Sequence, residues 1–342
     1  MDINEIECFL RKKYEFEDFT VAKLAGDASD REFYRVIFPE PVCEGAATAV
    51  LMVLGAPWTE GELPYLNVRD FMERVGLPVP KLYEYDLAAG FILIEDFGDL
   101  TLEEAIKGKS EEDVEALYKK AVDLMLAIQV GGTRECDDSC ISFSVAFDVE
   151  KLMFEFNFFY EHALMTYKGG GITPDDERII KAGFLDIARV LASEAKYLNH
   201  RDYHSRNLMV KSDGGLALVD FQDARLGPIQ YDLVSLVYDS YVPLPASLPG
   251  AMYEYCLNEL EAKYGLPQDR DAFMKIFDYM TVQRCIKAAG SFAYLDCVKK
   301  KNRYLKYFRP CLSHVKPAVD RRPELLPFFN TLAKYVEELI PE

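Results

Sequence analysis

The sequence has no apolar run long enough to span a membrane, and its beginning, MDINEIECFLRKKY, lacks the apolar core of a signal peptide. We therefore expect a cytoplasmic protein that does not associate with membranes. Basic residues are scarce as well, because 39 Lys and Arg stand against 57 Asp and Glu, for a formal net charge of −18. Since clustered Lys and Arg bind phosphate backbones, this balance argues against a nucleic-acid-binding function.

Two further absences concern metal and nucleotide motifs. Among the eight cysteines, Cys136 and Cys140 form the only close pair, and no second pair of cysteines or histidines lies near them. A loop is therefore favoured over a zinc site, and the thiols are expected to be reduced. The glycine-rich run at 168–171 leads into Ile-Thr-Pro and not into Lys-Ser/Thr, so it is not a Walker loop.

The residues that are present indicate a well-packed chain with two different parts. Half of the 342 residues are hydrophobic and 13% are aromatic, as in a globular protein with room for two cores. From the capping box that starts at Thr101, apolar residues recur mostly at helical spacing. We predict an α+β protein with a small antiparallel-β N-lobe, residues 1–96, and a larger α-helical C-lobe, residues 97–342. Within the N-lobe we expect helices at 2–13 and 67–75 and strands at 21–24, 33–38, 48–54, 82–86 and 90–95.

One segment, residues 199–224 (NHRDYHSRNLMVKSDGGLALVDFQDA), carries a pattern typical of phosphoryl transfer. Asp202 lies in a polar loop, Asn207 follows five residues later, and two apolar runs around a Gly-containing turn lead to Asp220. In this pattern the loop carboxylate orients a hydroxyl and accepts its proton, while the Asn and the second Asp hold Mg²⁺ on the phosphates. The alternative interpretation is an ordinary polar loop whose side chains cap helices. It does not explain why a predicted hairpin follows Asn207 and ends in Asp220. We expect Asp232 to anchor the loop and Asp223 to lie beside the site, where it would contact the substrate.

A second Asp-Phe pair competes for the metal-binding role. Asp96-Phe97-Gly98 is a literal DFG sequence, but it stands about a hundred residues before the catalytic loop and follows a predicted strand. Asp220 is followed by Phe-Gln but closes the predicted hairpin. The context therefore favours Asp220 as the metal ligand and residues 95–98 as a hinge whose backbone faces adenine.

The first predicted hairpin has a small polar tip that lets backbone N–H groups approach a phosphate. An ordinary hairpin turn is the competing interpretation, because the tip holds a single glycine and no GxGxxG. The residues of this candidate phosphate loop are Gly26, Asp27, Ala28 and Ser29.

The segments NHRDYHSRNLM and VDFQDARLGPIQYDLVSL resemble the aminoglycoside phosphotransferase family, which has the bilobal protein-kinase-like fold. Within it, GDASDREFYRV, EDFGDLTLEEA and QRCIKAAGSF are similar to the branch of bacterial anomeric kinases for N-acetylmuramate and N-acetylglucosamine. The resemblance runs from about residue 20 to about residue 300. It implies an enzyme of cell-wall recycling that uses ATP and Mg²⁺ on a small amino sugar, and it gives no indication of a protein partner. It also implies roles for Asp202 as the base, Asn207 and Asp220 as Mg²⁺ ligands, Glu95 and Phe97 as backbone contacts to adenine, and Ser29 over the phosphates.

The strand at 48–54 lacks the lysine that protein kinases place on the corresponding strand. Arg31 and Arg35 on the first hairpin, or Arg206 beside Asn207, are candidates to supply this charge to ATP. The missing lysine also keeps open a nucleotide-binding pseudokinase with a regulatory role. Another hydroxyl kinase of the aminoglycoside or choline kinase type is a further alternative.

Substrate recognition is expected from the C-lobe, where Arg284 and Lys287 lie one turn apart in an apolar helix and share a face. Such a pair suits a substrate carboxylate, as in the lactyl group of a muramic acid. A solvated or internally salt-bridged face is the alternative. Because aminoglycosides are polycations, the sign of the charge around Asp202 distinguishes the two classes of substrate.

Overall fold

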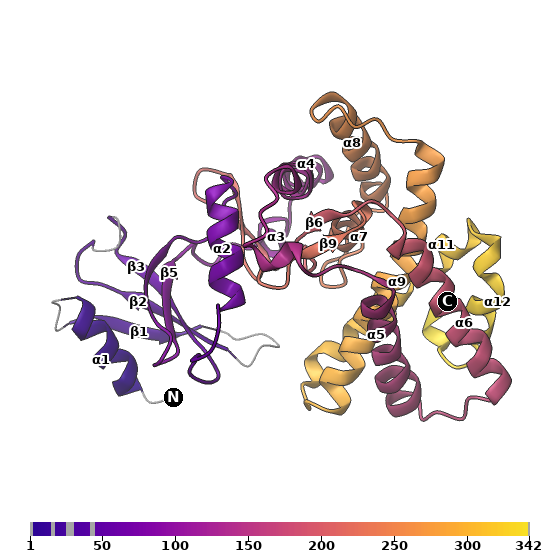
Figure 1. The fold of residues 1–342 in the computed structure, drawn as a ribbon, viewed down its shortest axis with the longest axis horizontal. Helices are drawn as coiled ribbons and strands as arrows, with labels where there is room; N and C mark the ends of the chain where they lie inside the picture. The colour runs from indigo at the N-terminus through magenta and orange to yellow at the C-terminus, as the bar shows by residue number, and fades with distance from the viewer. Residues whose placement is uncertain (1–2, 15–17, 25–30, 42–44, 341–342) are drawn as a thin grey trace. The chain divides into compact units, whose positions relative to one another are not determined.

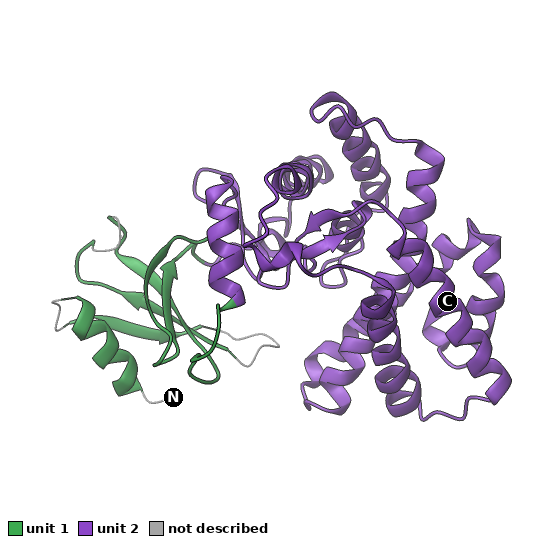
Figure 2. Cartoon of the chain, viewed as in Figure 1, with its two compact units in different colours: residues 1–63, 79–98 green, residues 64–78, 99–342 purple. Residues whose placement is uncertain are grey.

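The computed structural model describes residues 3–14, 18–24, 31–41 and 45–340, and the chain divides into two compact units (Figure 2). The first unit comprises Met1–Leu63 with Val79–Gly98, and the second comprises Pro64–Pro78 with Asp99–Glu342. Strands predominate in the first unit and helices in the second (Figure 1), as the sequence predicts. None of the helices in the described ranges is both long and apolar enough to cross a membrane.

The first unit is built on an antiparallel sheet of five strands in the order β1-β2-β3-β5-β4. Each strand lies within one residue of its predicted range, because alternating apolar residues and turn residues mark the strands clearly. The strands are β1 (Thr20–Lys23), β2 (Glu32–Ile37), β3 (Thr48–Val53), β4 (Leu82–Asp86) and β5 (Phe91–Glu95).

Helix α1 (Ile3–Lys13) supplies part of the core of this unit. Its Ile6, Phe9 and Leu10 recur at helical spacing and are buried together with the inward-facing residues of β2, β3 and β5. The Phe9 ring lies 5.1 Å from the ring of Phe91 on β5. The period of 3.6 in the helix and of two in the strands thus produces one shared apolar layer.

Helix α2 (Pro64–Arg74) packs with the second unit, although the sequence places it within residues 1–96. Its Tyr65 ring stacks on Phe221 at 5.1 Å, and the Asn67 side chain donates to the Ser139 carbonyl at 2.8 Å and accepts from the Ile141 amide at 2.9 Å. These partners are distant in sequence, so local patterns do not reveal them. The first unit therefore lacks residues 64–78 and extends to residue 98 rather than 96.

The second unit is organised around helix α9 (Arg270–Cys297), which is buried over most of its length. Helices α5, α6, α7, α10 and α11 pack against it. The helices that precede it are α3 (Leu102–Ala105), α4 (Glu111–Leu126), α5 (Val149–Phe159), α6 (Pro174–Ala192), α7 (Gln230–Val237) and α8 (Leu248–Ala262), with π-helical continuations η1 (Ala127–Gly132) and η3 (Tyr160–Tyr167). Those that follow it are η4 (Asn302–Tyr307), α10 (Phe308–Leu312), α11 (Val315–Asp320) and α12 (Leu326–Ala333). The predicted cap of α3 is confirmed, since the Thr101 hydroxyl accepts the Glu104 amide at 3.2 Å.

Candidate active site

The predicted catalytic segment forms two short strand pairs within the second unit. Strand β6 (Tyr197–Asn199) pairs with β9 (Arg225–Gly227), and β7 (Leu208–Val210) pairs with β8 (Leu216–Leu218). Asp202 and Asn207 lie between β6 and β7, and Asp220 lies two residues after β8. The Val219 amide donates to the Asn207 carbonyl at 3.1 Å, which joins the two loop ends.

A buried carboxylate, Asp232 near the start of α7, holds the catalytic loop. It accepts the backbone N–H of His200 at 2.7 Å and that of Arg201 at 3.0 Å. Arg201 has a φ of +80°, a left-handed conformation that is unusual outside glycine, so these bonds stabilise a strained backbone next to Asp202. Burial raises the pKa of Asp232 to about 7. The predicted anchoring role of Asp232 is confirmed.

We expect Asp232→Asn to lower the free energy of unfolding by about 1–3 kcal/mol, because the amide nitrogen replaces an acceptor oxygen and leaves a buried N–H unpaired. Urea unfolding followed by circular dichroism measures the change. Asp213→Asn is a matched control, since its exposed side chain lies in the turn of the same segment, and its effect should stay below about 0.5 kcal/mol. Equal stability of the Asp232 variant and the wild type would contradict the anchoring role.

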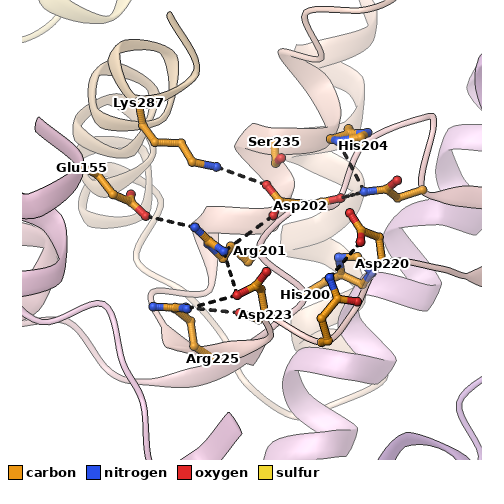
Figure 3. A network of polar contacts seen from close by, with 12 residues as sticks. Glu155, His200, Arg201, Asp202, His204, Asp220, Asp223, Arg225, Ser235 and Lys287 are labelled. Atoms are coloured by element: carbon orange, nitrogen blue, oxygen red, sulfur yellow. Dashed lines mark hydrogen bonds and ion pairs between the residues drawn. The ribbon is translucent and has the colours of Figure 1, made fainter. Parts of the chain in front are cut away.

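The carboxylate of Asp202 lies between two cations (Figure 3). Lys287 Nζ donates to its Oδ1 at 3.1 Å, and Arg201 Nη1 is 4.0 Å from its Oδ2. Burial by itself would raise the pKa of Asp202, but Lys287, Arg201 and Arg284 hold this pKa well below its ordinary value. The side chain is 26% exposed. Asp202 is therefore ionised near neutral pH and accessible to a ligand.

Two residues near Asp202 were not among the site residues predicted from the sequence. They are Glu155 on α5 and Arg201. Glu155 is buried, accepts from Gln283 Nε2 at 2.9 Å and lies 3.7 Å from Arg201 Nη2. Arg201 also pairs with Asp223 at 3.1 Å, so Asp223 lies beside the site as predicted. The position of Arg201 directly before Asp202 could have indicated its role. For Glu155, the sequence shows only a charged residue within an apolar helical pattern.

Basic and acidic side chains lie together around Asp202, and Figure 3 shows Lys287, Arg201 and Arg225 with the carboxylates of Glu155, Asp220 and Asp223. The charges that act most strongly on Asp202 itself are those of Lys287, Arg201 and Arg284, although the whole chain is strongly acidic. The cations of this region are Lys151, Arg201, Arg225, Arg284 and Lys287, and the carboxylates are Glu155, Asp202, Asp220, Asp223 and Asp232.

Arg284 and Lys287 share a face of α9, as predicted from their spacing. Arg284 Nη2 donates to the Ser235 hydroxyl of α7 at 2.9 Å, whereas Lys287 reaches Asp202. Burial lowers the pKa of Lys287, and the Asp202 carboxylate opposes this shift. The alternative of an internal salt bridge therefore applies to Lys287, which pairs with the Asp202 carboxylate.

Asn207 and Asp220 offer oxygen donors that suit Mg²⁺. Asn207 Nδ2 donates to the Asp202 carbonyl at 2.9 Å, which orients the amide and leaves its oxygen for another group. Asp220 is exposed, has a φ of +64°, and accepts from Gln222 Nε2 with one oxygen only, at 2.8 Å. The described part of the chain contains no cluster of three or more His, Cys, Asp or Glu that could hold a metal. A two-donor site fits Mg²⁺, because this ion usually takes few protein ligands and completes its shell with phosphates and water.

The candidate phosphate loop, Gly26, Asp27, Ala28 and Ser29, lies outside the described residues. The hinge candidate Glu95 uses its amide to donate to the Lys81 carbonyl at 2.9 Å, so this amide is not available for a contact to adenine. Arg31 and Phe97 are partly buried, and their contacts to nucleotide stay predictions.

Asp96 of the DFG-like sequence takes part in an ion pair of the first unit. Arg35 donates to it through Nε at 2.7 Å and through Nη2 at 3.0 Å, and the Gly98 amide donates to it at 2.9 Å. Its carboxylate therefore has a structural role that needs no metal.

Arg206, the third candidate for the missing lysine, is also paired. Its Nε donates to Glu103 at 2.7 Å, and its Nη2 donates to the Tyr307 hydroxyl at 2.9 Å. A contact to ATP through Arg206, or through Arg35, would therefore compete with an existing carboxylate partner.

Comparison with known proteins gives results that agree with this geometry. The family model described as phosphotransferase enzyme family matches residues 20–264. The N-acetylmuramate/N-acetylglucosamine kinase of Neisseria meningitidis serogroup B is 28% identical over 98% of this chain and 97% of its own length. The enzyme of the same name from Pseudomonas aeruginosa is 28% identical over 90% of this chain and 86% of its own.

Solved structures of small-molecule kinases have the same fold. A choline kinase from Cryptosporidium parvum superposes with a TM-score of 0.64 at 9% identity, covering 95% of this chain and 96% of its own. An ADP-bound aminoglycoside phosphotransferase gives a TM-score of 0.60 at 14% identity, with both chains fully covered. The predicted α+β, bilobal kinase-like fold is confirmed.

Proposed function

Because the chain belongs to the phosphotransferase enzyme family, we propose that it is an ATP-dependent kinase for the anomeric hydroxyl of N-acetylmuramate and N-acetylglucosamine. The names of its relatives from Neisseria meningitidis and Pseudomonas aeruginosa support this acceptor. Solved structures of the same fold with bound ADP or AMP-PNP support ATP as the phosphoryl donor.

The observation that carries the choice of acceptor is the set of cations directed at Asp202. Lys287 and Arg201 lie within 4.0 Å of this carboxylate, and Arg284 acts on it from α9. Such surroundings repel an aminoglycoside polycation and tolerate a neutral or anionic sugar. The lactyl carboxylate of N-acetylmuramate would be attracted by the same cations.

Asp202 would accept a hydrogen bond from the C1 hydroxyl and direct its oxygen at the γ-phosphorus of ATP. A bond forms between the C1 oxygen and this phosphorus, the bond from phosphorus to the β–γ bridging oxygen breaks, and the hydroxyl proton passes to Asp202. A carboxylate with a strongly lowered pKa is a weak base, but in a loose transition state the hydroxyl needs orientation more than early deprotonation. An anomeric hydroxyl is also more acidic than an ordinary alcohol, which suits such a base.

Asn207 and Asp220 would hold Mg²⁺, and the bound ion would neutralise charge on the phosphates. The residues of the chain prepare this site in two ways. The Asp202 carbonyl orients the Asn207 amide, and the left-handed backbone at Asp220 turns its carboxylate out of the hairpin toward solvent.

ATP consumption with a panel of acceptors tests the proposal. We expect turnover with N-acetylglucosamine and N-acetylmuramate, little turnover with kanamycin or choline, and a ³¹P NMR signal coupled to the C1 proton of the product. Asp202→Ala should abolish this turnover. Preference for kanamycin or choline would contradict the sugar assignment, and ATP binding without turnover on any acceptor would instead support the pseudokinase alternative.

A further inference from the structure

The second unit has a cavity of about 1210 Å³ that the proposed reaction leaves unexplained. This volume exceeds the roughly 300–1,000 Å³ usual for sites that hold drug-sized ligands, so a single monosaccharide would fill only part of it. Its walls come from the segment after α7, from α8 and α9, and from η4, α10 and α11. The rings that line it belong to Tyr238, Tyr241, Tyr253, Phe277, Tyr307 and His314.

The cavity adjoins the catalytic loop. Its Tyr241 ring lies 5.1 Å from the ring of His204, and its Asp239 accepts the backbone N–H of Ser205 at 2.9 Å. On its other side, His204 Nε2 lies 3.4 Å from Asn207 Nδ2, which is bonded to the Asp202 carbonyl. The His204 ring therefore lies between Tyr241 of the cavity wall and Asn207 of the candidate site.

The charged residues of the lining are mostly paired with protein groups. Glu103 binds Arg206 at 2.7 Å, Arg321 binds Asp278 at 2.6 Å, and Glu254 pairs with Arg270. Asp239 is used by Ser205, as described above. Lys306 is exposed, with its Nζ 4.9 Å from the centroid of the Tyr307 ring. The cavity therefore presents rings and hydroxyls more than unpaired charge, which favours an uncharged ligand with both apolar faces and hydroxyl groups.

We propose that this cavity is a subsite for a second, uncharged pyranose, so that the enzyme phosphorylates the reducing end of an N-acetylated disaccharide. The inference rests on the proposed function, since the C1 hydroxyl of the first sugar would lie at Asp202. The second ring, linked through the far side of the first, extends past His204 toward Tyr241. The C–H faces of a pyranose pack on aromatic rings, and its hydroxyls bond to tyrosine hydroxyls.

Gly250 on α8 allows the cavity to be filled without disturbing the catalytic loop. It lines the cavity, and a Cβ added there meets no atom within 4 Å. Its φ lies outside the left-handed region, so a larger side chain is compatible with the backbone. Gly131 in η1 has the same two properties but is not part of the cavity lining, and it is the matched control.

The test compares KM for N,N′-diacetylchitobiose and for N-acetylglucosamine. We expect Gly250→Trp to raise KM for the disaccharide about tenfold, because the new side chain keeps the second sugar from packing on the aromatic rings of the cavity. KM for the monosaccharide should change less than about twofold. Gly250→Ala should have a small effect on the disaccharide, and Gly131→Trp should change neither value.

Two results would overturn the subsite while leaving the proposed function intact. One is an equal effect of Gly250→Trp on both sugars, and the other is a wild-type enzyme that phosphorylates the monosaccharide alone. Failure with both sugars would overturn the proposed function instead. In that case calorimetric titration with N,N′-diacetylchitobiose tests the cavity as a binding site. The cavity is excluded if the wild type does not bind the disaccharide, or if Gly250→Trp binds it as tightly as the wild type does.

Discussion

Asp202→Asn is expected to lower kcat for sugar phosphorylation by about 10³-fold, within the roughly 10²–10⁴-fold range for loss of a positioned acid–base group. The amide cannot accept the hydroxyl proton, and it would orient the acceptor poorly because one of its two polar atoms is a donor. Steady-state ATP consumption at saturating N-acetylglucosamine and MgATP measures the effect.

The control for this variant has to separate chemistry from folding. Asn has nearly the shape of Asp, so the midpoint of thermal unfolding and the affinity for ATP should change little. Asp213→Asn, an exposed substitution in the same segment, should keep the wild-type kcat. A wild-type kcat in the Asp202 variant would exclude this carboxylate from the reaction.

Lys287→Met is expected to lower kcat/KM by about ten- to a hundredfold. The lysine donates a 3.1 Å bond to Asp202, and a hydrogen bond to a charged group contributes about 1.5–3 kcal/mol, which corresponds to this range in rate. Lys287→Arg should restore part of the activity because it keeps the charge. Lys316→Met, an exposed lysine on α11 paired with Asp320, is the matched control and should have no effect.

The pH dependence distinguishes this electrostatic role from a structural one. In the wild type, Lys287 and Arg201 counter burial and hold the pKa of Asp202 well below its usual value, so its carboxylate remains ionised at mildly acid pH. Without Lys287 the pKa of Asp202 rises, and kcat/KM should fall more at about pH 5 than at about pH 8. A uniform loss at all pH values would indicate that Lys287 only supports the packing of α9.

Local sequence was sufficient for the strands of the first unit and for the cap of α3. It was also sufficient to identify Asp202, Asn207 and Asp220 as candidate residues of one phosphoryl-transfer site. These three residues lie within one strand–turn–strand segment, so short-range hydrogen bonds such as that from Val219 to Asn207 determine their proximity. The choice of Asp220 over the DFG-like Asp96 as the candidate metal ligand also followed from this local context.

The electrostatics of the site could not be derived in the same way. Lys287 follows Asp202 by 85 residues, and Glu155 comes from a helix that precedes it. The packing of α5 and α9 against each other accompanies these contacts, in which Lys287 reaches Asp202 and Glu155 reaches its neighbour Arg201. Helical spacing predicted which face Arg284 and Lys287 share, but not that Lys287 pairs with the candidate base.

The sequence alone therefore predicted phosphoryl-transfer chemistry, because Asp202, Asn207 and Asp220 lie within one short segment of the chain. The tertiary structure decided the remaining features, which are the cations paired with Asp202, the ion pair that occupies Asp96, the assignment of α2 to the second unit and the cavity beside His204. The physical reason is that charge and cavity shape depend on contacts between helices that are distant in sequence, whereas the strand and loop pattern depends on adjacent residues.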